Sequence, residues 1–238
     1  MHNRVVDTFN QLASVYEHTV DTMSLYNSEY ERPAMMQQLP QDLQDLNILD
    51  AGCAAGWYTE QLVDRGAHVV ATDISPEMVS ATKRRIGNKA NVLCLDLQGE
   101  LPFEDRTFDI IISSLTLHYL KEWGPTLKEF QRVLKPDGLL LFSIHHPFSD
   151  IKLLGNPNYY FTELIIDKWY KEGKYFEVPF YRRPIHSIIN ETVNYFTIEK
   201  IIEPQPTTTF KMQEPEKYEN LMKSPQFLII IGRKLGER

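Results

Sequence analysis

The segment from Ile48 to Leu62 constrains the fold of this chain more than any other part of the sequence. Residues 48–57 read Ile-Leu-Asp-Ala-Gly-Cys-Ala-Ala-Gly-Trp, and helical sequence follows. We expect a short buried strand, a tight turn of small residues and then a helix. Small residues let a ligand lie against the backbone, and a helix N-terminus offers unpaired N–H groups to it. The sequence therefore predicts a ligand-binding loop after a strand.

Two kinds of nucleotide-binding loop compete for this segment. A dinucleotide fingerprint places its third glycine at the sixth position counted from Gly52, where this chain has Trp57, whose ring would block close helix packing. The pattern acid-x-Gly-x-Gly-x-Gly fits better, since Asp50, Gly52 and Gly56 match and Ala54 alone departs. This segment resembles motif I of the class I S-adenosylmethionine-dependent methyltransferases. The methyl group of Ala54 must fit where that family has hydrogen, so we expect a slight displacement of the loop or the cofactor.

Composition sets the broad class of the protein. The 238 residues are 42% hydrophobic and 24% charged, as in a soluble globular domain, and no apolar run approaches the roughly 20 residues of a membrane helix. The N-terminal residues lack the apolar core of a signal peptide, so we expect a cytoplasmic protein without a membrane partner. A net charge of −7 argues against nucleic acid as a partner. The basic cluster 83–85 lies near the end of a predicted helix, where cations are favoured.

The two cysteines are expected to be free thiols. Cys53 lies on the turn and Cys94 in a later apolar run, on strands that we place two positions apart. That separation is roughly 10 Å, which exceeds the reach of a disulfide.

Strands and helices alternate through the middle of the chain. Apolar runs predict strands at 68–72, 91–95, 108–114 and 138–144, and helical patterns lie at 5–17, 33–39 and 125–134. Ser75 and Pro76 have the pattern of an N-cap followed by a first helical residue. Apolar strands alternating with helices indicate a parallel sheet that is covered on both faces.

The last third of the chain is different. It predicts a turn at 171–174, a helix at 184–193 and two strands at 196–202 and 227–232. The resemblance implies an α/β, Rossmann-like three-layer sandwich with a seven-stranded, mostly parallel sheet in the order 3-2-1-4-5-7-6, the last strand antiparallel. We expect one methyltransferase domain over 1–238: a helical cap at 1–45, a cofactor-binding core at 46–146, an aromatic-rich insertion at 147–195 that forms a substrate wall or lid, and C-terminal strands at 196–238.

Acidic residues at the ends of the second and third strands are the strongest cofactor candidates. Ligands of an open parallel sheet bind beyond the carboxyl ends of its strands, at the point where the strand order reverses. The carboxylate of Asp73 can accept hydrogen bonds from two ribose hydroxyls, although an aspartate there can instead cap a helix. By the resemblance, Asp96 accepts from the adenine amino group, the alternative being an ordinary loop residue. Ile74 and Leu97 lie beside them.

Further segments extend the resemblance over about residues 48–145. Leu-Pro-Phe at 101–103, the strand at 108–114 and Val-Leu-Lys-Pro-Asp-Gly at 133–138 occur in the family's order and spacing. Ser114 is then expected near the methionine part of the cofactor. In the cap, Tyr16, Tyr26 and Arg32 are candidates to close over the cofactor, and Arg32 could pair with its carboxylate. Each could equally be a surface or packing residue.

The resemblance implies methyl transfer to a small-molecule acceptor by direct displacement, as O- or N-methylation. The protein then contributes mainly alignment and exclusion of water, and a base is needed only if the acceptor must lose a proton. His118, His145 and His146 follow the fourth and fifth strands and are the candidate bases. The alternative for each is a histidine bonded to a loop carbonyl. No residue is assigned to a metal.

The aromatic residues of 157–183 are the expected substrate contacts. They could instead build a small antiparallel sheet or an oligomer interface, so a homodimer stays open. They are Tyr159, Tyr160, Phe161, Trp169, Tyr170, Tyr175, Phe176, Phe180 and Tyr181.

Two other functions compete with a methyltransferase. Tyr170 and Lys174 supply the Tyr-x-x-x-Lys spacing of short-chain dehydrogenases, but Gly173 lies between them in what reads as a hairpin rather than a helix. A sensor or scaffold that binds S-adenosylmethionine without turnover is the second alternative. The histidines and aromatic residues favour turnover over it.

Overall fold

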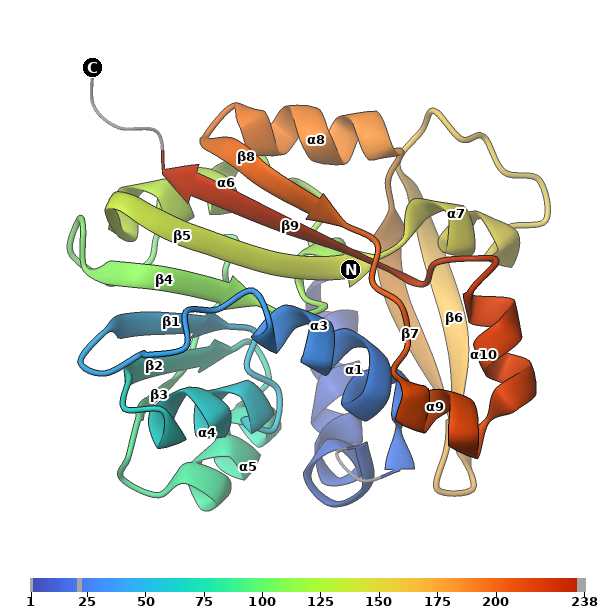
Figure 1. The fold of residues 1–238 in the computed structure, drawn as a ribbon, viewed down its shortest axis with the longest axis horizontal. Helices are drawn as coiled ribbons and strands as arrows, with labels where there is room; N and C mark the ends of the chain where they lie inside the picture. The colour runs from blue at the N-terminus through green and yellow to red at the C-terminus, as the bar shows by residue number, and fades with distance from the viewer. Residues whose placement is uncertain (1, 21–22, 235–238) are drawn as a thin grey trace.

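A seven-stranded sheet forms the centre of the protein (Figure 1). The computed structural model describes residues 2–20 and 23–234, so residues 1, 21–22 and 235–238 of the predicted segments lie outside the described residues. The strands lie in the order β3-β2-β1-β4-β5-β9-β8, and β9 runs antiparallel to both of its neighbours. The order matches the predicted one once the separate hairpin of β6 (Glu163–Lys171) and β7 (Lys174–Arg182) is left out of the numbering. The strands of the sheet are β1 (Asn47–Ala51), β2 (His68–Asp73), β3 (Asn91–Cys94), β4 (Phe108–Ser113), β5 (Leu134–His145), β8 (Phe196–Ile202) and β9 (Phe227–Lys234).

Helices cover both faces of this sheet, as the apolar strands predict. Successive residues of a strand point to opposite faces. Accordingly, Ile111 packs with α6 (Gly124–Val133) and α8 (Ile185–Val193), whereas Ile110 and Ile112 pack with α3 (Arg32–Met36) and α4 (Trp57–Asp64). Helix α5 (Pro76–Ile86) packs against α4, β2 and β3. Both cores are buried, which fixes the register of the strands.

The expected element boundaries agree with the structure to within a few residues. Ser75 caps α5, because its Oγ accepts a hydrogen bond from Met78 N at 3.1 Å, and Pro76 is the first helical residue. Strand β5 begins at Leu134, four residues before its predicted start, since Phe108 of β4 pairs with it there. The helices α9 (Thr208–Gln213) and α10 (Pro215–Leu221) between β8 and β9 were not predicted.

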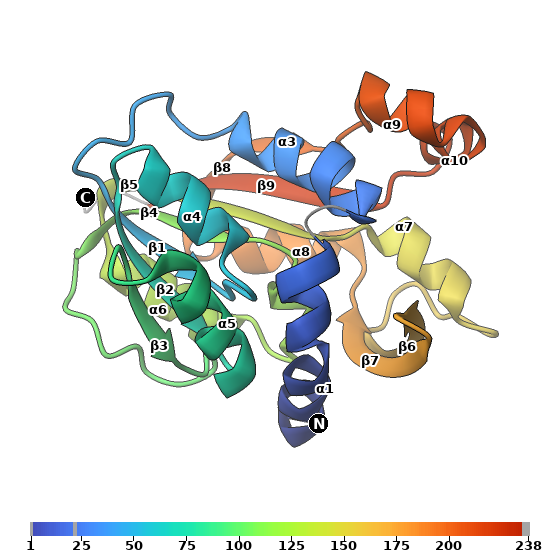
Figure 2. The same ribbon diagram turned by 90° about the horizontal axis from the view of Figure 1, so that it is seen from below.

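The N-terminal cap lies across the carboxyl end of the parallel strands (Figure 2). It consists of α1 (His2–Val15), the π-helical turns η1 (Tyr16–Val20) and η2 (Asn27–Glu31), and α3. Helix α1 contacts both α5 and the hairpin strand β7. The guanidinium of Arg84 on α5 donates to Glu17 of η1 at 2.6 and 2.8 Å, and Arg4 pairs with Glu177 of β7. These ion pairs join the cap to the core on one side and to the hairpin on the other.

The insertion after β5 forms a small second sheet beside the cap. Helix α7 (Pro147–Asp150) and the turn η4 (Ile151–Leu153) lead into the antiparallel strands β6 (Glu163–Lys171) and β7 (Lys174–Arg182) (Figure 1). The predicted turn at 171–174 is confirmed, because Lys171 pairs with Lys174. The aromatic segment is therefore largely a hairpin, and the cap helix α1 packs on its strand β7.

Cys53 is buried and Cys94 is exposed, and both are free thiols as expected. Over residues 2–20 and 23–234, no helix is long and apolar enough to cross a membrane.

Candidate functional site

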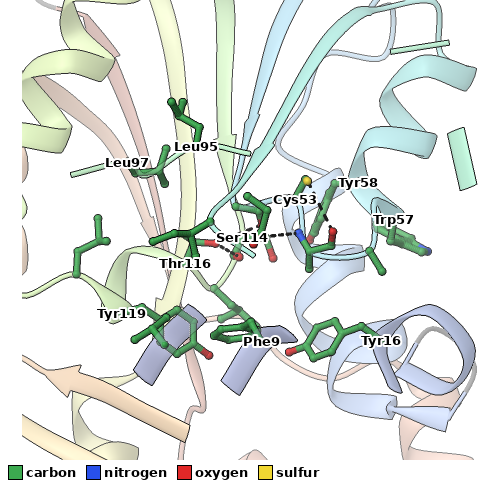
Figure 3. A pocket seen from close by; sticks show the side chains of 18 of the residues that line it. Phe9, Tyr16, Cys53, Trp57, Tyr58, Leu95, Leu97, Ser114, Thr116 and Tyr119 are labelled. Carbon is green, nitrogen blue, oxygen red and sulfur yellow. Dashed lines mark hydrogen bonds between the residues drawn. The ribbon is translucent and has the colours of Figure 1, made fainter. Parts of the chain in front are cut away.

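A cavity of about 350 Å³ lies where the carboxyl ends of β1, β2 and β4 meet the cap. Figure 3 shows the rings of Phe9, Tyr16 and Tyr119 on one side of it and Cys53 and Ser114 on the other. This is the point of strand-order reversal at which open α/β sheets bind ligands. Of the predicted site residues, those that line the cavity are Tyr16, Arg32, Gly52, Ala54, Asp73, Ile74, Asp96, Leu97, Ser114 and His145.

The loop after β1 forms one wall and has little room for side chains. Gly52 has φ +87°, and a Cβ atom there would lie 2.2 Å from Thr116 Oγ1. Gly56 has φ +82° and caps α4; a Cβ atom there would lie 2.8 Å from Thr82 Cγ2. Ala54 has φ +47° in the same left-handed region, where a side chain is strained. The backbone accommodates Ala54, so the loop keeps the turn that the predicted motif requires.

Asp73 joins the end of β2 to this loop. Its Oδ2 accepts from Ala54 N at 3.0 Å and its Oδ1 from Ser75 N at 2.8 Å. Burial raises the pKa of Asp73 to about 6. Each carboxylate oxygen keeps a second lone pair, and the side chain lines the cavity.

The end of β3 supplies a mixed polar and apolar wall. Asp96 Oδ1 accepts from Gln98 N at 3.0 Å, so this carboxylate also shapes its own turn. Leu95 and Leu97 flank it, and all three residues line the cavity (Figure 3 shows the two leucines). Apolar side chains around a carboxylate suit a flat ring that carries a hydrogen-bond donor.

Asp50 and Gly56, predicted to contact the cofactor, do not line the cavity. The Asp50 side chain is buried beneath the loop and accepts from Thr59 Oγ1 at 2.6 Å. Burial raises its pKa to about 7. Asp50 thus ties β1 to α4, and Gly56 provides the left-handed turn between them. Both position the loop from behind rather than meet a ligand in the cavity.

Glu31 is a buried carboxyl group that the sequence analysis missed. It accepts hydrogen bonds from Tyr58 Oη at 2.7 Å, from Ser114 Oγ at 2.9 Å and from Ser143 Oγ. Burial raises its pKa. Tyr58 and Ser114 line the cavity, so Glu31 orients two of its walls. A glutamate in a short helical turn has no sequence pattern that separates it from a surface residue.

The predicted cap residues differ in their positions. Tyr16 and Arg32 line the cavity, and the Arg32 guanidinium lies 4.3 Å from the centre of the Trp57 ring. Burial raises the pKa of Tyr16 to about 12. Tyr26 does not line this cavity; its ring packs edge-on against Phe210, with 5.8 Å between the ring centres.

A second cavity of about 450 Å³ adjoins the first. The residues shared by both linings are Tyr16, Asn27, Leu115, His145 and Trp169. The further lining of the second cavity includes Tyr26, Asp150, Asp167, Tyr170, Lys171, Phe180 and Phe227. A molecule in the second cavity could therefore contact five of the residues that line the first.

Two of the predicted histidines lie together at this junction. The rings of His118 and His145 are stacked with centres 4.1 Å apart, and His145 Nδ1 lies 3.5 Å from Asp150 Oδ1. Burial lowers the pKa of His145 to about 4 and that of His118 well below its usual value. Within the described residues, neither ring nitrogen of His118 has a hydrogen-bond partner, and His118 lines neither cavity.

His146, predicted as a base, lies outside both cavities. Its side chain is completely buried, its Nδ1 accepts from Phe148 N at 3.2 Å, and its Nε2 lies 2.8 Å from Glu203 Oε1. These contacts cap α7 and join it to the segment after β8. The reason is strand alternation: His145 and His146 are consecutive and face opposite ways.

The aromatic segment serves packing and cavity lining together. Trp169 and Tyr181 line the first cavity, and Tyr170 and Phe180 line the second. Phe176 is buried in the core between the hairpin and α1. Other members face solvent, with exposed fractions of 63–76% for Tyr160, Phe161 and Tyr175.

The dehydrogenase alternative fails on geometry. Tyr170 lies in β6 and Lys174 in β7, on opposite sides of the hairpin turn. The pair cannot stand one turn apart on a helix, as that chemistry requires.

Comparison with known proteins identifies the family. Residues 49–142 match the methyltransferase domain family. The chain is 25% identical to an S-adenosylmethionine-dependent methyltransferase of Mesorhizobium loti, with a TM-score of 0.69 over 86% of this chain and 97% of that one. An uncharacterised protein of Haemophilus influenzae is 27% identical over 228 residues, which are 88% of this chain and 89% of that protein.

A malonyl-[acyl-carrier protein] O-methyltransferase of Acetivibrio thermocellus is 37% identical over 113 residues. The match covers 44% of this chain and 38% of that enzyme, so the likeness concerns less than half of either protein. The sheet order and the residues matched by the domain family both point to a methyltransferase. The cofactor is S-adenosylmethionine. The chain therefore contains a methyltransferase domain over residues 49–142 and has the fold of the class I S-adenosylmethionine-dependent methyltransferases.

Proposed function

We propose that the protein transfers the methyl group of S-adenosylmethionine to a small-molecule acceptor, with the cofactor in the first cavity and the acceptor in the second. The observation that carries this proposal is the junction between the cavities, where Tyr16, His145 and Trp169 contact both. Direct displacement needs the donor and the acceptor side by side. Two adjoining cavities meet that requirement.

The first cavity fits the cofactor. Gly52 lines the cavity with its backbone, and a Cβ atom there would overlap the Thr116 side chain. Asp73 would accept hydrogen bonds from the ribose hydroxyls, and Asp96 from the adenine amino group. Arg32 would pair with the cofactor carboxylate. Gly52, Ala54, Ile74, Leu97, Ser114 and Tyr16 would form the remaining contacts.

When bound, the cofactor supplies a methyl group activated by a sulfonium ion. The residues of the chain align the acceptor and exclude water. The aromatic rings of Phe9, Tyr16, Tyr119 and Trp169 form the water-excluding side of the cavity. Alignment and desolvation are the main contributions that a protein makes to methyl transfer.

His145 is the proton acceptor that the geometry favours. It lines both cavities, and its low pKa keeps the ring neutral at pH 7, with a lone pair available. Nδ1 lies 3.5 Å from Asp150 Oδ1, so Nε2 is the ring nitrogen without that contact. His118 supports the ring by stacking. Oxygen and nitrogen acceptors are both compatible with this arrangement, and the Acetivibrio relative is an O-methyltransferase.

Titration calorimetry tests the cofactor site. We expect S-adenosylmethionine to bind the wild type and Asp73→Ala to lose at least about tenfold in affinity, since two charge-assisted hydrogen bonds disappear. Asp64→Asn, an exposed carboxylate paired with Lys89, is the control and should bind normally. Unchanged affinity in Asp73→Ala would refute the site assignment. Transfer of a labelled methyl group to a metabolite extract then tests turnover.

A further inference from the structure

The second cavity has an unusual combination of walls. Aromatic rings of Trp169, Phe180 and Phe227 surround it, and the carboxylates of Asp150 and Asp167 face it from α7 and β6. Among the described residues that line this cavity, Lys171 at the end of β6 is the only lysine or arginine. Two carboxylates against one ammonium group make this cavity acidic at the side away from the loop after β1.

Asp150 is the more informative of the two carboxylates. Its side chain is 9% exposed, and its Oδ1 lies 3.5 Å from His145 Nδ1. Burial raises its pKa to about 8, with Asp167 adding to the rise and Arg182 opposing it. His145 is neutral at pH 7, so this contact is not an ion pair. At pH 7 this carboxyl group is therefore largely protonated, and a cation beside it would stabilise the anion.

Within the described part of the chain, a direct ion pair with a lysine or arginine does not supply that cation, although the charge of Arg182 lowers the pKa of Asp150. Among residues 2–20 and 23–234, no lysine or arginine forms an ion pair with Asp150 or Asp167. The guanidinium of Arg182 donates instead to the carbonyls of 158 and 159 and to Glu163, each at 3.0 Å. The oxygens of Asp167 accept from Lys168 N at 2.8 Å and from Trp169 Nε1 at 2.9 Å, which aims the carboxylate and leaves each oxygen a second lone pair.

We propose that the methyl acceptor carries a basic amino group, which the second cavity holds between Asp150 and Asp167 while the aromatic rings pack on its apolar body. This inference rests on the proposed function, because it takes the second cavity as the acceptor site. The ammonium group gains from both carboxylates and from the faces of the aromatic rings. An acceptor carrying a carboxylate at the same point would be repelled.

Binding of matched probes tests the proposal. The enzyme with bound S-adenosylhomocysteine is titrated with 2-phenylethylamine, 2-phenylethanol and 3-phenylpropanoate, which share a phenyl body and differ in charge. We expect the amine to bind at least about tenfold more tightly than either of the others. Equal or tighter binding of the alcohol or the acid, or no binding of the amine, would overturn the proposal.

Substitution of the two aspartates tests whether they hold the amine. Asp150→Asn should reduce amine affinity at least about tenfold and leave the affinity for S-adenosylhomocysteine unchanged, because Asp150 does not line the first cavity. Asp167→Asn is the second variant should Asp150→Asn fail to fold, and Asp64→Asn is the control. An amine preference that survives both substitutions contradicts the assignment. If the wild type did not bind S-adenosylhomocysteine, the proposed function would be refuted. Failure of the amine proposal is thus distinguishable from failure of the proposed function.

Discussion

The carboxylate of Asp73 accepts a hydrogen bond from the backbone N–H of Ala54 at 3.0 Å, and this bond joins the end of β2 to the turn that follows β1. Thr82 Oγ1 of α5 also donates to the carbonyl of Ala54, at 2.7 Å. Ala54, the residue that departs from the family motif, is therefore held through both its backbone N–H and its carbonyl. Tertiary contacts keep Ala54 in the left-handed conformation that glycine would adopt freely.

Replacing Ala54 with glycine should be well tolerated. The change relieves about 1–2 kcal/mol of left-handed strain, which offsets the lost methyl contacts and the greater freedom of the unfolded chain. Ala55 is the matched control: it is buried and has no positive φ, so Ala55→Gly should destabilise by about 1 kcal/mol more than Ala54→Gly. Denaturant unfolding measures both. Equal losses would show that Ala54 is not strained.

Replacing Gly52 with alanine should damage the loop. The new Cβ would overlap the Thr116 side chain, with Cγ2 at 2.4 Å, and the residue would be strained at φ +87°. Gly87 separates the two effects, since it has φ +61° and nothing within 4 Å of an added Cβ. We expect Gly87→Ala to cost about 1 kcal/mol and Gly52→Ala about 1–3 kcal/mol more, with weakened cofactor binding. Similar unfolding energies for the two variants would contradict the predicted overlap.

The titration of Asp50 should lower the free energy of unfolding as pH rises. Its folded-state pKa, about 7, lies above the ordinary 3.8, so the folded protein binds the proton more tightly than the unfolded chain. The contribution is fully present below about pH 4 and is lost as pH rises through about 7. His145 has the opposite sign, because its pKa is lowered to about 4 and its stabilising effect is lost in acid.

The variant Asp50→Asn isolates this effect, since the amide does not titrate and its oxygen can still accept from Thr59. Thermal unfolding of both proteins from pH 5 to 8 should show the wild type losing stability relative to the variant as pH rises. Parallel curves would mean that Asp50 has an ordinary pKa in the folded protein.

Replacing Glu31 with alanine should destabilise the protein more than is usual for a residue in a short helical turn. Glu31→Ala would leave three hydroxyl groups, including those of Tyr58 and Ser114, without their acceptor. We expect a loss of roughly 2–4 kcal/mol in the free energy of unfolding and weaker cofactor binding. Glu31→Gln keeps an acceptor oxygen and should lose less. Glu60→Ala on α4, whose side chain is 39% exposed, should stay within about 0.5 kcal/mol of the wild type.

Local sequence patterns predicted much of the site because they encode backbone geometry. Gly52 and Gly56 occupy left-handed turns that favour glycine, and Ser75 with Pro76 begins α5. Asp73, predicted from its place at the end of a strand to bind the ribose, lines the cavity. The same patterns could not separate Asp50, which is buried beneath the loop, from Asp73, since both are aspartates at the ends of neighbouring strands.

The sequence by itself determined the strands and helices, the turn after β1 and the residues that follow the strands, because apolar runs, glycine conformation and helix caps are local properties. The order of the sheet was implied by the resemblance of these segments to a family. Only the tertiary structure decided which of these residues share a cavity. It buried Glu31 under Ser114, a residue 83 positions away, and placed His145 in the lining of both cavities while His146 became a helix cap. Such contacts depend on how the cap and the hairpin pack against the sheet, and that packing joins segments whose spacing in the sequence has no regular period.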